Sequence, residues 1–305
     1  MLSLTITGSV TIVPAGLAGA VVAIVALGCG LGVLFYSRPA LKQTTLLAAW
    51  WWTLAAVVVW SGVEAYAALL SPAIAAGRLA PFRLAAMALS LCPMVAVLGA
   101  KRPQHTAWQF VVVSLWGILA LPAAEAFFLH RGQQLEVGDA RAWLLWIVVL
   151  LGPINFLPTR RWLASLLVAA GQVVALSRYL ALIHRPITPQ SELTGLAICV
   201  VGLVVALGAN RRLRMDANSL DHLWLGFRDA FGLLWGLRVQ ERVNAVARQN
   251  GWDLELTWRG LRNTTDDSPL VAIDPAIEPA LRKTLTGLLR RFVSTEWIAE
   301  RLRSP

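Results

Sequence analysis

The chain has 305 residues, of which 57% are hydrophobic and 14% are charged, and its formal net charge is +10. Because soluble proteins carry about 25% charged residues, this composition excludes an ordinary soluble protein. Much of the positive charge falls in short segments between apolar spans, where Lys and Arg set membrane topology. No basic block with interleaved aromatic residues is present, so we do not expect a nucleic-acid partner.

Charged residues are sparse before the basic stretch Asn210–Arg214 and frequent after it. Before it, residues 1–210 hold 12 Lys and Arg and 5 Asp and Glu, whereas residues 211–305 hold 15 and 12. We interpret the stretch as the point where the chain leaves a bilayer. The sequence therefore predicts a transmembrane helical bundle over residues 1–210 and a cytosolic α+β domain over residues 211–305.

Seven apolar spans precede this junction. They run approximately over 13–36, 46–70, 84–100, 107–129, 142–157, 162–183 and 193–209. A helix of about 20 residues crosses the hydrocarbon core of a bilayer. The third, fifth and seventh spans are short, and a re-entrant segment is the alternative for each. The predicted fold class is mainly α: a polytopic α-helical membrane protein with about seven transmembrane helices.

Loop charges predict the orientation of these spans. Every second loop holds a basic pair: Arg38 with Lys42, Lys101 with Arg102, and Arg160 with Arg161. Basic loops remain on the cytoplasmic side. We therefore expect a multi-pass protein of the inner or plasma membrane, with its N-terminus outside and its C-terminus in the cytoplasm.

Three charged residues lie at predicted membrane depth, where charge is costly and marks candidate functional sites. They are Glu64, Glu125 and Arg178, each late in its span. We predict one polar layer, in which Arg178 pairs with Glu64 or Glu125 and Glu192 lies nearby. The alternative is that each side chain extends to water at the interface.

The C-terminal region begins with a helix from Asn218 or Ser219 to about Gln249. It carries an aromatic stripe at helical spacing, formed by Trp224, Phe227, Phe231 and Trp235. In one interpretation the stripe makes this a juxtamembrane amphipathic helix that lies on the lipid surface. In the other it packs on the strands that follow.

Those strands complete an α-β-β-α-α order. Residues 252–258 alternate apolar and polar side chains, as a half-buried strand does, and we predict the second strand at 270–273. A helix opens at Pro275 or Pro279, and Ser294 caps the last helix. We expect these residues to fold as a separable domain.

The sequence offers no catalytic, metal or cofactor motif. It has no GxxxxGK[ST], HExxH or GxSxG, and its four histidines lack metal-ligand spacing. We therefore predict no cofactor. The spacing of Gly28 and Gly32 permits close helix packing, within the chain or in a homo-oligomer.

Three functions remain open. The first is a non-enzymatic sensor or scaffold that displays a small cytosolic domain, which binds a protein partner. The second is a small-solute transporter or transporter subunit that uses the charged layer. The third is a membrane-embedded lipid-processing enzyme, which usually needs clustered carboxylates or histidines.

Overall fold

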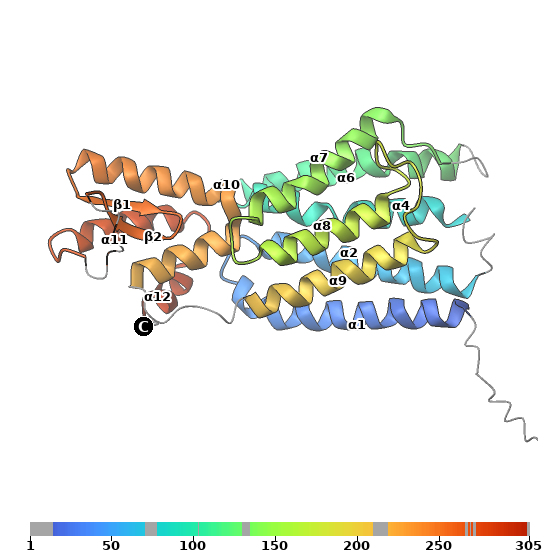
Figure 1. Cartoon of the computed structure of the whole chain (residues 1–305), viewed down its shortest axis with the longest axis horizontal. Helices are drawn as coiled ribbons and strands as arrows, with labels where there is room; N and C mark the ends of the chain where they lie inside the picture. The colour runs from blue at the N-terminus through green and yellow to red at the C-terminus, as the bar shows by residue number, and fades with distance from the viewer. Residues whose placement is uncertain are drawn as a thin grey trace, which may run out of the picture.

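The computed structural model describes residues 15–70, 78–102, 104–129, 135–209, 219–265, 268, 270 and 273–303. A bundle of long helices continues at one end into a smaller unit with three helices and a β-hairpin (Figure 1). We call this smaller unit, residues 219–303, the tail. The end of the bundle next to the tail is called proximal, and the opposite end is called distal.

Among the described residues, the bundle is built from α-helices joined by turns and loops. Its helices are α1 (Ala15–Leu41), α2 (Leu47–Leu69), α4 (Ala80–Leu89), α5 (Cys92–Leu98), α6 (His105–Phe128), α7 (Asp139–Phe156), α8 (Trp162–Leu176) and α9 (Ser191–Ala209). α4 and α5 together form one span, broken just before Pro93. With that pair counted once, six segments among the described residues are long and apolar enough to cross a membrane.

α8 differs from the sequence prediction. The sequence predicts a sixth span over 162–183, but α8 ends at Leu176 after 15 residues. The Ser177 hydroxyl then donates to the carbonyl of Val174 (2.8 Å), and Leu182 and His184 have positive φ angles. The chain therefore turns before a full-length helix is complete. By contrast, the fifth and seventh spans form helices of 18 and 19 residues.

α8 and α9 pack closely because small residues face each other. A Cβ added to Gly171 would lie 2.6 Å from both Sγ of Cys199 and the carbonyl oxygen of Gly195. Only glycine permits that separation between the two backbones. At Gly28 and Gly32 an added Cβ would meet nothing within 4 Å. Their spacing is therefore not used between the described helices, and a homo-oligomer stays a prediction.

The tail has the predicted order of elements. They are α10 (Ser219–Gln249), β1 (Leu254–Thr257), β2 (Gly260–Asn263), α11 (Glu278–Leu289) and α12 (Thr295–Arg303). α11 has a proline at its start, and the Ser294 hydroxyl accepts from the backbone N–H of Trp297 (3.2 Å) at the start of α12. The predicted proline start and serine cap are confirmed.

The second strand lies elsewhere than predicted. β2 pairs antiparallel with β1 directly after a two-residue turn, with Leu256 opposite Leu261. The sequence predicts this strand at 270–273, of which 271 and 272 lie outside the described residues. Gly260 explains the early turn, because its φ of +126° is open to glycine. The turn also lets Leu261 enter the core, where it is 2% exposed.

The aromatic stripe of α10 lies in the core of the tail. Trp224, Phe227 and Phe231 are fully buried, and Trp235 is 7% exposed. Phe227, Phe231 and Trp235 each contact the ring of Phe292 edge-on. The membrane-surface interpretation of these four residues is therefore corrected: they pack inside the protein and are not available to lipid head groups.

This core also continues into the bundle. Leu46 at the start of α2, together with Val97 and Ala100 after α5, is buried in the same cluster as the tail's aromatic residues. The expected separable domain thus shares its core with the proximal end of the bundle.

Candidate functional site

A charged pocket of about 430 Å³ lies at the distal end of the bundle, between α1, α2, α4 and α9. Four charged side chains line it: Glu64 of α2, Arg83 of α4, Arg178 after α8, and Glu192 of α9. We call it the distal pocket. Charge at the end of several apolar helices is costly, so such a cluster is the first place to look for function.

Glu64 forms an ion pair with Arg83. Nη2 of Arg83 donates to Oε2 of Glu64 over 2.9 Å, and the two side chains are 3% and 20% exposed. The pair holds α2 against α4 and offsets part of the cost of burying each charge. The predicted partner, Arg178, lines the same pocket but does not form this pair, which corrects the pairing we expected.

Glu125 lies outside the distal pocket. It lies on α6, with Oε1 4.0 Å from Nη2 of Arg141 on α7, and its side chain is 43% exposed. Of the three predicted residues, the structure therefore brings Glu64 and Arg178 together and leaves Glu125 outside.

Arg178 and Glu192 are the remaining charges of the pocket. Within the part of the chain that the structure describes, neither forms an ion pair within 4.0 Å. One cation and one anion thus face the pocket beside the neutralised Glu64–Arg83 pair. This arrangement suits a small solute that carries both a negative and a positive group.

At the other end, the tail is docked on three proximal loops. The segment after α11 donates and accepts backbone hydrogen bonds there. These are Thr45 N to Phe292 O (2.9 Å), Ser294 N to Gln43 O (2.8 Å) and Arg102 N to Arg291 O (2.8 Å). Paired backbone groups fix the position of this segment against the bundle.

The last turn of α7 contacts the tail at a break in α10. Gly232 has a φ of +80°, which interrupts the helix. Asn155 of α7, 1% exposed, inserts its side-chain amide there. Its Nδ2 donates to the carbonyl of Phe231 (3.2 Å), and its Oδ1 accepts from the N–H of Leu234 (3.0 Å). One side chain of the bundle therefore satisfies both backbone groups that the break exposes.

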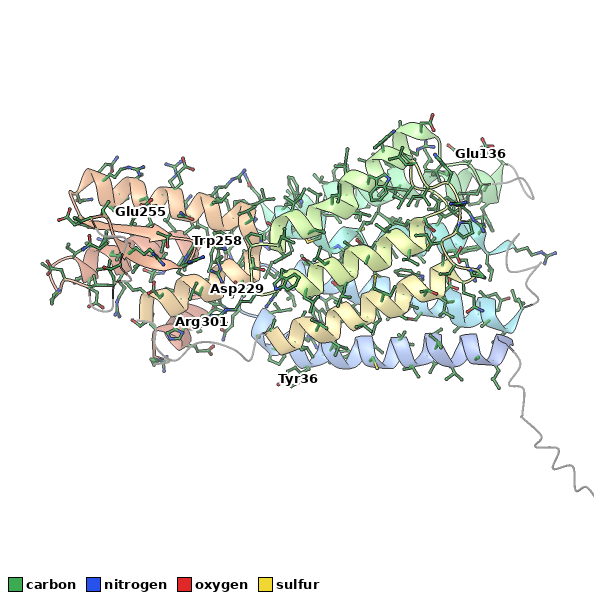
Figure 2. All side chains as sticks on the ribbon, viewed as in Figure 1. Tyr36, Glu136, Asp229, Glu255, Trp258 and Arg301 are labelled. Atoms are coloured by element: carbon green, nitrogen blue, oxygen red, sulfur yellow. The ribbon has the colours of Figure 1, made fainter. Side chains whose placement is uncertain are left out.

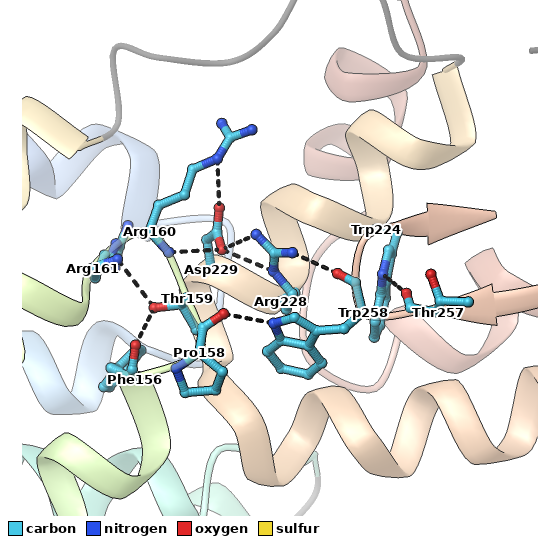
Figure 3. Close-up of polar contacts among 10 residues, drawn as sticks. All are labelled: Phe156, Pro158, Thr159, Arg160, Arg161, Trp224, Arg228, Asp229, Thr257 and Trp258. Carbon is cyan, nitrogen blue, oxygen red and sulfur yellow. Dashed lines mark hydrogen bonds and ion pairs between the residues drawn. The ribbon is translucent and has the colours of Figure 1, made fainter. Parts of the chain in front are cut away.

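A charged network surrounds the turn between α7 and α8 (Figure 3). Asp229 of α10 accepts from Arg228 (2.7 Å to Nη2) and lies 3.7 Å from Nε of Arg160. The indole N–H of Trp258 donates to the carbonyl of Pro158 (2.6 Å). Figure 2 shows Asp229 and Trp258 where tail and bundle meet. The Arg160–Asp229 ion pair and the Trp258–Pro158 hydrogen bond join the tail to this turn, and Arg228 orients the Asp229 carboxylate.

A single helix connects the two sites. α2 begins beside Leu46 in the tail's core and carries Glu64 at the distal pocket. Eighteen residues at 1.5 Å each separate Leu46 from Glu64, or about 27 Å along the helix.

A scan of protein-family models, a search of curated proteins and a search of solved structures each found no match for this chain. The site's own geometry therefore carries the functional argument.

Proposed function

We propose that the protein is a non-enzymatic membrane sensor, which binds a small zwitterionic solute in the distal pocket and signals through the docked tail. The observation that carries this proposal is the position of α2, which has one end in the tail's core and Glu64 at the pocket. A rigid helix that contacts both sites is able to transmit a shift at one to the other.

The membrane arrangement is part of the proposal. We propose seven crossings, with α8 and the turns that follow it as the sixth, and with the tail in the cytoplasm. Support comes from the three loops with basic pairs, all of which lie at the proximal end with the tail. A reporter that functions only in the cytoplasm is expected to be active when it is fused after Pro305. An exported reporter that is active at the same position contradicts the orientation.

The ligand class follows from the charges. A carboxylate on the solute pairs with Arg178, and an ammonium group pairs with Glu192. Glycine betaine and free amino acids are suitable probes, with acetate and ethylamine as single-charge controls. Purified protein is expected to gain thermal stability with the zwitterions only, and Arg178→Gln and Glu192→Gln are each expected to abolish the gain. Equal stabilisation by acetate contradicts the zwitterion assignment.

Transport is a second candidate, because α2 and α9 line both the distal pocket and a second cavity nearer the tail. About one turn of α2, including Ser61 and Val63, separates the two. Uptake of a labelled zwitterion into proteoliposomes tests this function. Accumulation that Glu64→Gln abolishes in a folded protein favours transport over sensing.

A further inference from the structure

A second cavity of about 210 Å³ lies inside the bundle, between α2, α5, α7, α8 and α9. Its wall is mostly aliphatic, with Val57, Met94, Val168, Leu196 and Leu203 among its lining residues. We call it the bundle cavity. Because most of the wall is aliphatic, we expect the main part of its occupant to be apolar.

Thr53, Ser90, Ser165 and Gln172 also line the bundle cavity, and two further polar side chains, Trp60 and Arg161, line its opposite ends. Trp60 is 2% exposed, and among the described residues its indole N–H has no hydrogen-bond partner. Arg161 lines the cavity at the proximal end, next to the tail, where Asp229 offsets part of its charge. Its guanidinium has five N–H donors, enough to bind an anionic oxygen in addition to a protein partner.

We propose that the bundle cavity binds one acyl chain of an anionic phospholipid whose head group lies at Arg161. The position fits, because the cavity lies between four segments long and apolar enough to span a membrane and the shorter apolar helix α8, and Arg161 is at one end of them. The aliphatic wall of the cavity offers van der Waals contacts to an acyl chain, without the cost of burying a polar group. The phosphate pairs with the guanidinium at head-group depth.

Glycine positions provide a matched test. Gly152 lines the bundle cavity, and an added Cβ would have only Met94 within 4 Å, at 3.5 Å. Gly117 is an exposed glycine on α6 with nothing within 4 Å. Gly152→Leu fills the cavity, whereas Gly117→Leu makes the same chemical change outside it. Ala206→Leu, also on the cavity wall, is the second filling variant in case Gly152→Leu does not fold.

The full chain is purified in detergent, delipidated, and titrated with phosphatidylglycerol, phosphatidylcholine or decanoate. Native mass spectrometry counts bound lipid, and thermal unfolding monitors folding. Wild type and Gly117→Leu are expected to retain one phosphatidylglycerol and to prefer it over phosphatidylcholine by about tenfold, or about 1.4 kcal/mol. The filling variants are expected to lose this lipid, and Arg161→Gln is expected to lose the preference.

Three results overturn the proposal. Undiminished phosphatidylglycerol binding by a folded filling variant removes the cavity as the site. Equal binding of phosphatidylcholine by wild type removes the anionic head group at Arg161. Binding of decanoate without phosphatidylglycerol assigns the cavity to a free fatty acid instead of a bilayer lipid.

Discussion

Asn155 of α7 and Phe231 of α10 are joined by a hydrogen bond of 3.2 Å, although 76 residues separate them in the chain. The bond forms where Gly232 breaks α10, and the same amide also accepts from Leu234. The tail is thus anchored to the bundle at the point where its longest helix bends. The Asn155 amide therefore contacts α10 on both sides of Gly232.

Replacing Asn155 tests this anchor. Asn155→Leu leaves the Phe231 carbonyl and the Leu234 N–H without their partner. Each buried, unsatisfied group costs about 1–3 kcal/mol, so we expect a loss of about 2–5 kcal/mol and faster proteolysis of α10. Asn250→Leu, at an exposed position, is the control and is expected to change stability little. Equal effects of the two substitutions argue against the anchor.

Gly232 is expected to tolerate no side chain. Its φ is positive, and an added Cβ would clash with Nδ2 of Asn155 and lie 2.7 Å from the backbone carbonyl oxygen of Asn155. Gly232→Ala should therefore destabilise the protein by more than about 2 kcal/mol. Gly287→Ala, in α11 with nothing within 4 Å, should stabilise it by up to about 1 kcal/mol. Thermal unfolding of both variants is the measurement. A Gly232→Ala protein as stable as wild type would show that the break in α10 accepts a side chain.

The ion pair in the distal pocket predicts which charges are coupled. In a double-mutant cycle, Glu64→Gln and Arg83→Gln should be non-additive by about 1–3 kcal/mol, because Glu64 is buried. Glu125→Gln with Arg141→Gln should be additive within about 0.5 kcal/mol, since both side chains are partly exposed. Stronger coupling of Glu64 to Arg178 than to Arg83 is the outcome that this structure does not permit.

Asp221 in the tail predicts a pH dependence. It is buried, and burial is the main cause that raises its pKa from 3.8 to about 6, against the Leu261 N–H and His222, which lower it. The folded protein therefore binds more protons than the unfolded chain between about pH 4 and 6. The stability contributed by protonated Asp221 is complete below about pH 4 and is lost as the pH rises through 6.

Asp221→Asn removes this dependence. The amide oxygen keeps the acceptor for the Leu261 N–H (2.7 Å), and no ionisation remains. At pH 7 we expect a gain of at most about 3 kcal/mol and a flatter stability profile between pH 4 and 7, measured by thermal unfolding. Asp253→Asn, at an exposed position, is the control. A less stable Asp221→Asn at pH 7 shows that the carboxylate is needed.

The sequence predicts features that depend on residues close together in the chain, such as the ends of helices. The bounds of α10 agree with the cap near Ser219 and the stop at Asn250, because these signals act within one turn of the helix. The sequence does not predict Arg83 as the partner of Glu64, because the third apolar span begins at Leu84, after Arg83. Pro81 at the start of α4 was the available signal that the helix begins earlier.

Other features depend on contacts between distant segments. Asn155 looks like a polar residue for helix–helix bonding, and no local pattern shows that its partner is a broken helix in the tail. The aromatic stripe has one periodicity whether it faces lipid or protein, so only the tertiary packing around Phe292 decides between them.

Hydrogen exchange of α10 tests most directly whether the distal pocket communicates with the tail. The full chain in lipid nanodiscs is compared as wild type, Glu64→Gln and Glu125→Gln, with peptides covering Ser219–Gln249 followed by mass spectrometry. We predict that Glu64→Gln, which breaks the pair with Arg83, changes protection on both sides of Gly232, and that Glu125→Gln leaves it unchanged. A folded Glu64→Gln protein with the exchange pattern of wild type would contradict the coupling.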